Sequence, residues 1–515
     1  MKSLARSFAL LLLSALPTAA QPTNVPVSAP GAASPNEITV AINPTDQRHV
    51  AAGSNVRYFY RSTDGGMSWV QSLLPPGTFG DPSIAYDANG NLYYAHLMSG
   101  LLRLGVHRST DNGITWYDSV TIGYNPPKNQ DKEWIAVDRT NSAYRNRLYL
   151  AWTEFDQYGS TNPADSTRIL FSWSSNAGTT WSTPVRLSDQ AGDCLDLDST
   201  VEGAVPAVGP EGQVYMSWAG PLGIVFDRST DGGATFGANI PVTSIPGGWD
   251  FAVPGIYRCN GLPETACDVS NSPYRGTVYI LWSDQRNGLD NTDVFLVRST
   301  DHGTTWGTVK RVNADITSRH QFYPWLSVDP LTGYLYVVYY DRAETAGDAT
   351  DIALAKSTDG GTTFSSVKVS ASSFVPQANV FFGDYLGMDA VNRSVVPVWM
   401  RMDNAILSVW SAPIADVPLS TDPEHGQPGD FILEQNYPNP FNPSTTIAYT
   451  LPHAGFVTLR VLDPLGREVA LLENGLRSSG RHTVVFEAAR LSSGIYIAQL
   501  RLGGVALAKP MMLVR

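Results

Sequence analysis

A motif of eight residues recurs six times between residues 62 and 364. Each copy has a Ser, then an Asp or Asn two positions later, a Gly two positions after that, and a Trp or Phe at the end. The acidic or amide oxygen can accept hydrogen bonds from its own turn, and the Gly supplies the positive φ of a tight hairpin. A turn repeated this often predicts an array of small antiparallel sheets. The copies are residues 62–69, 109–116, 174–181, 229–236, 299–306 and 357–364.

The segments between the motifs alternate apolar with small or polar residues, which is typical of strands. Residues 83–87, 92–97 and 104–108 predict three strands before the second motif, and counting such units along the chain gives seven. The seventh unit, which starts at residue 385, ends without a fourth strand. We expect residues 24–28 to supply it, because pairing the N-terminal strand into the last sheet removes exposed edges.

The six motifs resemble the Asp-box, or BNR repeat, of sialidases and related β-propellers. Together with the count of seven units, the resemblance implies an all-β chain with a seven-bladed β-propeller over residues 22–413. In that family each box is a hairpin between the third and fourth strands of a blade, on the face away from the ligand. We therefore interpret the Asp residues of the motifs as structural.

A second region follows a Pro-, Asp- and Gly-rich linker at residues 414–433. Residues 434–515 alternate like strands and are numerous enough for a small immunoglobulin-like β-sandwich. Four features in order resemble the type A sorting domain of the type IX secretion system: the segments 436–447, 461–469, 493–496 and 509–515. The resemblance implies transport across the outer membrane, with the secretion machinery as a partner.

Residues 1–20 have the basic, apolar and small-residue segments of a signal peptide. No other segment is long and apolar enough for a transmembrane helix, so we expect none in the mature chain. These features predict a protein that is secreted, either extracellular or on the outer-membrane surface. The formal net charge of -12 and the lack of a basic patch argue against nucleic acid as a partner.

The chain has three cysteines. Cys259 and Cys267 flank a short loop, and in an oxidising compartment a disulfide between them would leave Cys194 unpaired. Three reduced thiols are the alternative.

Strand direction alternates within each predicted sheet, so residues that enter first strands share a face with residues that follow second strands. The candidate catalytic residues, which enter first strands, are Asp81, Glu133, Glu202, Asp384 and Tyr385. The candidate ligand-binding residues, which follow second strands, are Arg57, Arg286, Arg342 and Arg401. Carboxyl groups in different environments can supply the acid and the nucleophile of glycoside hydrolysis, and arginines can hold a carboxylate-bearing sugar. Alternatively, Arg286 and Arg342 brace their own hairpins by pairing with Asp284 and Asp341.

The sialidase resemblance implies an Asp acid, for which Asp81 stands, and a Tyr–Glu nucleophile pair, for which Tyr385 and Glu202 stand. The chain has no Arg-Ile-Pro motif, and Ser217-Trp218 ends the strand after Glu202, where that family has an arginine. Two functions stay open: a sialidase-like exo-glycosidase, and a non-catalytic propeller that binds glycan or protein at the cell surface. In both, the expected partner is an extracellular glycan or glycoprotein.

No cofactor and no catalytic metal are expected. Acidic residues at 193, 196 and 198 and at 290–293 fit either structural calcium or solvated loops, because their spacing matches no specific calcium-binding loop.

Overall fold

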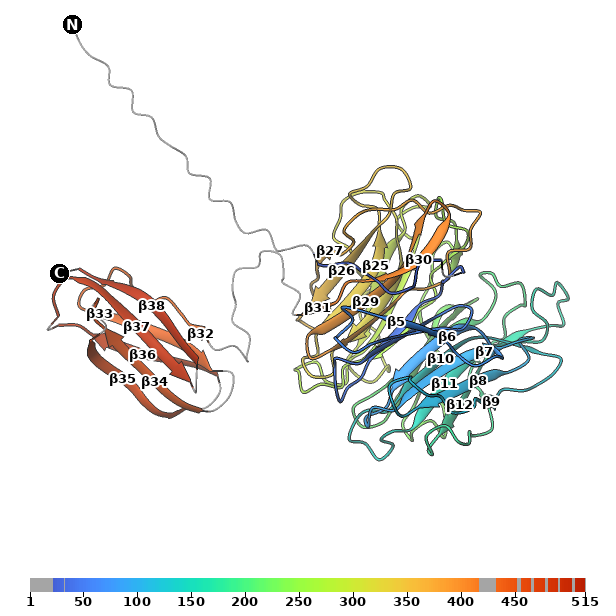
Figure 1. The fold of residues 1–515 in the computed structure, drawn as a ribbon, viewed down its shortest axis with the longest axis horizontal. Coiled ribbons are helices and arrows are strands. Elements are labelled where there is room, and N and C mark those ends of the chain that lie inside the picture. Colours follow the sequence, from blue (N-terminus) through green and yellow to red (C-terminus); the bar gives the residue numbers. More distant parts are fainter. Residues whose placement is uncertain are drawn as a thin grey trace, which may run out of the picture. The chain divides into compact units, whose positions relative to one another are not determined.

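A computed structural model describes residues 22–31, 33–415 and 432–514, apart from short gaps at 452–454, 465–466, 478–479, 490 and 503–504. The chain divides into two compact units, Met1–Ser420 and Thr421–Arg515 (Figure 1). Every regular element in these ranges is a strand, so the fold is all-β. No described segment forms a helix that could cross a membrane. The predicted signal peptide and most of the predicted linker lie outside the described residues.

Six sheets of the first unit each contain four antiparallel strands in chain order. The first three sheets are β2 (Thr39–Ile42), β3 (Val50–Ser54), β4 (Tyr58–Ser62) and β5 (Val70–Leu73); β6 (Thr78–Tyr86), β7 (Leu92–Met98), β8 (Leu104–Ser109) and β9 (Val120–Ile122); and β10 (Asn129–Val137), β11 (Leu148–Phe155), β12 (Thr167–Ser174) and β13 (Val185–Arg186).

The next three are β14 (Glu202–Val208), β15 (Val214–Gly220), β16 (Gly223–Ser229) and β17 (Ile240–Thr243); β20 (Glu264–Cys267), β21 (Val278–Asp284), β22 (Asp293–Ser299) and β23 (Lys310–Arg311); and β24 (Gln321–Val328), β25 (Leu335–Asp341), β26 (Asp351–Ser357) and β27 (Ser365–Lys368). A two-stranded sheet of β18 (Asp250–Phe251) and β19 (Cys259–Asn260) precedes β20.

The seventh sheet joins the two ends of the first unit. It contains β28 (Gly387–Val391), β29 (Ser394–Asp403) and β30 (Ile406–Ser411), with the short β31 (Ile414–Ala415) beside β29. Its remaining strand is β1 (Val25–Pro26), which pairs with β30 so that Val25 lies opposite Ser411. The prediction that residues 24–28 supply this strand is confirmed.

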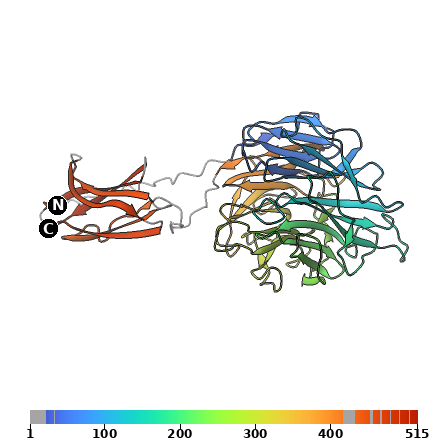
Figure 2. The same ribbon diagram turned by 90° about the horizontal axis from the view of Figure 1, so that it is seen from below.

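The first strands of the seven sheets contact one another in sequence: β2 with β6, β6 with β10, β10 with β14, β14 with β20, β20 with β24 and β24 with β28. β28 also contacts β2. In Figure 2 the orange strands of the seventh sheet accordingly lie beside the blue strands of the first. Apolar side chains fill the space between consecutive sheets; for example, Tyr93 and Val106 pack with Leu148 and Trp152.

Each of the six repeated motifs forms the turn between the third and fourth strands of its sheet. At Asp231 the carboxylate accepts a 2.9 Å hydrogen bond from the Thr235 N–H, and the other five motifs contain the equivalent bond. Burial opposes ionisation of Asp231, but hydrogen bonds from Ser229 and Thr235 lower its pKa to about 2. The carboxylates of these turns thus bind their own backbone, as the sequence predicts.

One motif glycine shows why the turn tolerates no side chain. Gly113 has φ +78°, and an added Cβ would lie 2.2 Å from Cζ of Phe59. Phe59 is fully buried, and its ring contacts Trp116 edge-on at a centroid distance of 5.0 Å. The ring therefore has no space to move away.

The second unit contains two antiparallel sheets around one apolar core, in which Ile447, Leu459 and Leu500 are fully buried. The first sheet is β32 (Ile432–Leu433), β33 (Ser444–Leu451) and β36 (Gly480–Glu487). The second is β35 (Glu468–Arg477), β34 (Gly455–Leu462), β37 (Gly494–Leu502) and β38 (Val505–Leu513).

The three cysteines, Cys194, Cys259 and Cys267, are buried and form no disulfide. The alternative of three free thiols therefore holds.

Candidate active site

A bulge at the start of four first strands sets the geometry of the site. In β10, β14 and β24 one extra residue interrupts the pairing with the second strand, and β6 has two such interruptions, of which the second contains Asp81. The first residue inside the second bulge of β6 and inside each of the other three bulges has a left-handed backbone: φ is 49° at Asp81, 50° at Lys132, 77° at Gly203 and 47° at Tyr323. A non-glycine residue in this region costs on the order of 1 kcal/mol. The bulges redirect polar side chains at one end of the first strands.

Lys132 is the centre of the polar network at this end. Its side chain is 7% exposed, and its Nζ lies 3.7 Å from Oδ2 of Asp81 and 3.8 Å from Oε1 of Glu37. The same Nζ donates a hydrogen bond to Asp384. Lys132 therefore joins carboxylates from three different sheets, although burial alone would disfavour its charge.

Arg258 is the second cation of the site. Its Nε donates to Oδ1 of Asp384 at 3.0 Å, its Nη2 donates to the other oxygen of Asp384, and its Nη1 donates to Asp196 at 2.5 Å. The hydroxyl of Tyr158 also donates to Asp196, at 2.5 Å. Burial raises the pKa of Asp384, but Lys132 and Arg258 outweigh it and hold the value near 2. Asp384 is thus a fixed carboxylate.

Glu133 and Glu202, in contrast to Asp384, are buried carboxyl groups that no cation among the described residues holds in the ionised form. Both are buried, at 1% and 0% exposure. Within the described part of the chain the Glu133 carboxyl group has no side-chain hydrogen-bond partner, and the Glu202 carboxyl group has Asp196 alone. Burial raises the pKa of each well above its usual value, and a neighbouring carboxylate, Asp81 for Glu133 and Asp196 for Glu202, raises it further. These two groups are therefore protonated under conditions in which Asp384 is ionised.

Seven carboxyl groups influence one another at this end of the strands, and we call them the carboxyl cluster: Glu37, Asp81, Asp131, Glu133, Asp196, Glu202 and Asp384. Burial, and then the charge of Asp81, raises the pKa of Asp131 to about 8. The pKa of Glu37 is raised for the same two reasons. The cluster therefore holds both neutral and ionised carboxyl groups, which is the combination that acid-assisted hydrolysis requires.

Tyr385 belongs to an aromatic layer beneath the cluster. Its hydroxyl donates to the Pro82 carbonyl at 3.3 Å, and its ring lies 4.9 Å from that of Trp134, which lies 4.7 Å from that of Trp325. Burial, and then Glu37, Asp81 and Glu133, raise the pKa of Tyr385, so the phenol is neutral. The carboxyl groups that act on Tyr385 most strongly do not include Glu202, which the sialidase resemblance made its partner.

The five predicted catalytic residues thus meet at one end of the first strands, whereas the four predicted arginines bind other groups. Arg286 pairs with Asp284 at 2.6 Å, as the bracing alternative predicts. Arg342 instead donates to the Pro254 carbonyl at 2.8 Å and to Thr350 at 3.0 Å. Arg57 donates to the Leu74 carbonyl at 2.7 Å, and Arg401 pairs with Asp403 at 2.6 Å. Arg57, Arg286 and Arg401 are held close to their own hairpins, whereas Arg342 reaches a segment 88 residues away and its Nη2 has no hydrogen-bond partner among the described residues. None of these bonds goes to a residue of the carboxyl cluster.

Sequence reasoning did not assign Glu37 or Arg258 to the site, and it assigned Asp196 to a loop. Arg258 lies between β18 and β19, outside the repeating strand pattern, so no periodic signal pointed to it. Asp198, two residues after Asp196, accepts a 2.8 Å hydrogen bond from the backbone N–H of Asp250, so this acidic loop contacts β18. Within the described ranges, no group of three or more His, Cys, Asp or Glu residues could hold a metal ion.

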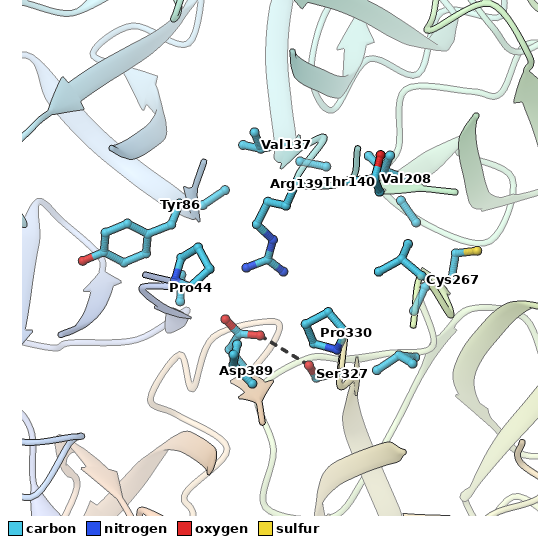
Figure 3. Close-up of a pocket in the computed structure, with 18 of the residues that line it drawn as sticks. Pro44, Tyr86, Val137, Arg139, Thr140, Val208, Cys267, Ser327, Pro330 and Asp389 are labelled. Atoms are coloured by element: carbon cyan, nitrogen blue, oxygen red, sulfur yellow. Dashed lines mark hydrogen bonds between the residues drawn. The ribbon is translucent and has the colours of Figure 1, made fainter. Parts of the chain in front are cut away.

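A cavity of about 970 Å³ lies at the other end of the first strands. Figure 3 shows Arg139 extending into it, opposite Asp389. Asp389 accepts a 2.8 Å hydrogen bond from the Ile42 N–H, and burial raises its pKa. Trp325 both lines this cavity and belongs to the aromatic layer, so the layer lies between the cavity and the carboxyl cluster.

Comparison with known families identifies the second unit. Residues 435–512 match the secretion system C-terminal sorting domain. This domain marks a protein that is secreted or held at the outer surface of the cell.

The chain is also similar to a sialidase and a xyloglucanase. A sialidase of Micromonospora viridifaciens is 24% identical over 294 residues, which is 50% of this chain and 42% of the relative. A xyloglucanase of Hypocrea jecorina is 26% identical over 309 residues, which is 52% of this chain and 32% of the relative. The chain therefore spans less than half the length of these two relatives.

Solved structures with a similar arrangement include an alpha-L-arabinanase of Penicillium chrysogenum, with 14% identity and a TM-score of 0.43 over 64% of this chain and 92% of that one. A sialidase of Streptococcus pneumoniae has 10% identity and a TM-score of 0.44 over 74% of this chain and 84% of that one.

Proposed function

We propose that the protein is an exported glycoside hydrolase that acts on extracellular glycans through the carboxyl cluster. The observation that carries the proposal is the buried carboxyl group of Glu133, which has no side-chain hydrogen-bond partner among the described residues, together with the buried Glu202 in the same cluster as the ionised Asp384. A buried carboxyl group without a hydrogen bond costs stability and is retained where it has a function. The distant relatives, a sialidase and a xyloglucanase, support glycans as the substrate class.

The catalytic roles proposed for the carboxyl groups follow from the burial and surroundings of each group. A glycosidase needs one neutral carboxyl group to protonate the leaving oxygen and one carboxylate to attack or to activate water. Glu133 and Glu202 suit the acid, because burial keeps them protonated. Asp81 suits the carboxylate, because its side chain is 13% exposed and lies beside Lys132. Asp384 positions Lys132, and the neutral Tyr385 supplies a hydroxyl below them.

We propose further that residues 22–413 form a closed, seven-bladed, sialidase-like β-propeller whose repeated turns are Asp-boxes. The successive contacts of the seven first strands, the return contact of β28 with β2 and the pairing of β1 with β30 support this architecture. The signal peptide at residues 1–20, the linker at 414–433 and the sorting domain at 434–515 complete the proposed organisation.

The test is hydrolysis of a panel of chromogenic glycosides and polysaccharides by the purified full-length protein. Glu133→Gln and Glu202→Gln keep the side-chain shape and should each reduce turnover about 100-fold or more, with unfolding still cooperative. Glu211→Gln is the matched control, because Glu211 is exposed and pairs only loosely with Arg275 at 3.5 Å. Full activity in both site variants would refute the proposed site. Glycan binding with no turnover by the unmodified protein would identify it as a binding module.

A further inference from the structure

The carboxyl cluster has far more acidic than basic groups. It contains seven carboxyl side chains. Among the described residues, two cations lie within hydrogen-bond reach of them, Lys132 and Arg258, and both bind Asp384. Arg258 also binds Asp196, so the contacts within the cluster use all three nitrogens of its guanidinium group. A ligand that carries a carboxylate would meet carboxyl oxygens here and no free guanidinium. Binding of such a ligand is unfavourable, because its charge would leave water with no unpaired cation to offset it, close to the ionised Asp384.

The unpartnered carboxyl group of the cluster points to hydroxyl-bearing ligands. Both oxygens of Glu133 are without a side-chain hydrogen-bond partner among the residues described, and Glu202 has Asp196 alone. A protonated carboxyl group donates one hydrogen bond and accepts others, and an ionised one accepts several. Sugar hydroxyls can both donate and accept, so they satisfy either form without bringing a charge into the site.

Three exposed aromatic side chains either contact residues of the carboxyl cluster or its cations, or lie close to them in sequence. We call them the aromatic rim: Phe79, Tyr158 and Tyr257. They are 46%, 42% and 60% exposed. Phe79 precedes Asp81 by two residues, and Tyr158 donates its hydroxyl to Asp196. Tyr257 precedes Arg258, and its ring contacts Phe381, the ring over which the Arg258 guanidinium lies at 5.6 Å. Exposed rings are flat apolar surfaces on which the C–H face of a sugar ring can stack.

We infer that the site takes a neutral glycan chain, stacked on the aromatic rim, and excludes acidic sugars such as sialic acid and uronic acids. The inference rests on the proposed function for the location of the site, but it concerns the substrate class alone. Three separate exposed rings linked to one acidic cluster suit a chain of several sugar units, with one unit at the carboxyl cluster and others on the rim.

The experiment compares neutral and acidic ligands on the same full-length protein. Chromogenic arabinosides, xylosides, glucosides and galactosides are assayed beside sialosides and glucuronides, and binding of neutral and acidic oligosaccharides is measured by calorimetry. Tyr257→Ala tests the rim. Tyr117→Ala is its control, because Tyr117 is 58% exposed but follows a repeated turn between the third and fourth strands. We expect neutral ligands to bind at least about tenfold more tightly than acidic ones, and Tyr257→Ala alone to weaken them about tenfold.

The outcomes separate the two proposals. Hydrolysis of neutral glycosides with the expected loss in Tyr257→Ala supports both. Preferred hydrolysis of a sialoside or glucuronide overturns the inference and leaves the hydrolase proposal intact. Rim-dependent binding of neutral oligosaccharides without hydrolysis supports the inference and refutes the hydrolase. An absence of binding to every glycan, or equal loss in Tyr257→Ala and Tyr117→Ala, overturns the inference.

Discussion

Arg258 holds Asp384 with two hydrogen bonds, one of them 3.0 Å long between Nε and Oδ1. Asp384 is 3% exposed and lies 126 residues away in the chain, directly before the seventh sheet. Arg258 lies in the segment before the fifth sheet, and the pair therefore joins parts of the fold that are distant in sequence. Lys132 binds the same carboxylate from the third sheet.

Removal of the Arg258 charge should destabilise the first unit. Arg258→Met leaves Asp384 buried with only Lys132 as its cation, and we expect a loss of about 3 kcal/mol in the free energy of unfolding, measured with urea. Arg48→Met is the control, because the Arg48–Asp46 pair, 2.6 Å long, is formed on the surface and should contribute little. Equal effects of the two substitutions would show that Arg258 does not act through a buried charge.

The repeated turns give a prediction about packing. Gly113→Ala combines a strained positive φ with a clash against the buried ring of Phe59, and should cost about 3 kcal/mol or more. Gly100→Ala has the same kind of backbone, φ +88°, but an added Cβ meets no atom within 4 Å. This control should cost only about 1 kcal/mol. Similar losses of stability in urea would mean that the ring of Phe59 moves freely.

The repeating features of the chain were predictable from the sequence. The six motifs and the alternating segments fixed the positions of the turns, and the incomplete seventh unit correctly pointed to residues 24–28. These predictions succeeded because strand alternation and turn residues are local properties of the chain. The same pattern placed Asp81, Glu133 and Glu202 at the entry of strands that it already defined, and their catalytic role stays a prediction.

The remaining site residues depend on long-range contacts. Arg258 lies in an irregular segment, and only the tertiary structure brings it to Asp384. The bulges that turn Asp81 and Lys132 inward have no local signal as clear as the repeated Gly of the motifs. The predicted arginines can bind a carboxylate-bearing ligand in principle, but in the structure they bind protein groups instead. Arg286 pairs with Asp284, and Arg57 donates to the Leu74 carbonyl.

The sorting domain gives a prediction about export. A chain that ends at residue 433 should fold, because each unit has its own apolar core, but should remain in the periplasm of a host with a type IX secretion system. Cell fractionation and immunodetection measure its location. The full-length chain is the control and should be recovered at the cell surface or in the medium. Surface delivery of the shortened chain would show that residues 434–515 are dispensable for export.

The carboxyl cluster predicts that stability falls as the pH rises from about 5 to 8. The pKa values of Glu133 and Glu202 are raised in the folded protein, so above the usual value of 4.5 the folded state binds more protons than the unfolded state. Their contribution is complete below 4.5 and is lost as the pH rises through the folded pKa, and Asp131, with its pKa near 8, extends the window upward.

Asp384 acts in the opposite direction, since its pKa is lowered to about 2, but its contribution is lost only in strong acid and stays constant across this window. Urea unfolding at pH 5, 6, 7 and 8 should therefore give a decreasing free energy, with a smaller slope in Glu133→Gln and Glu202→Gln, which cannot ionise. Glu211→Gln, at an exposed position, should keep the slope of the unmodified protein. An unchanged slope in both site variants would show that these carboxyl groups titrate normally in the folded state.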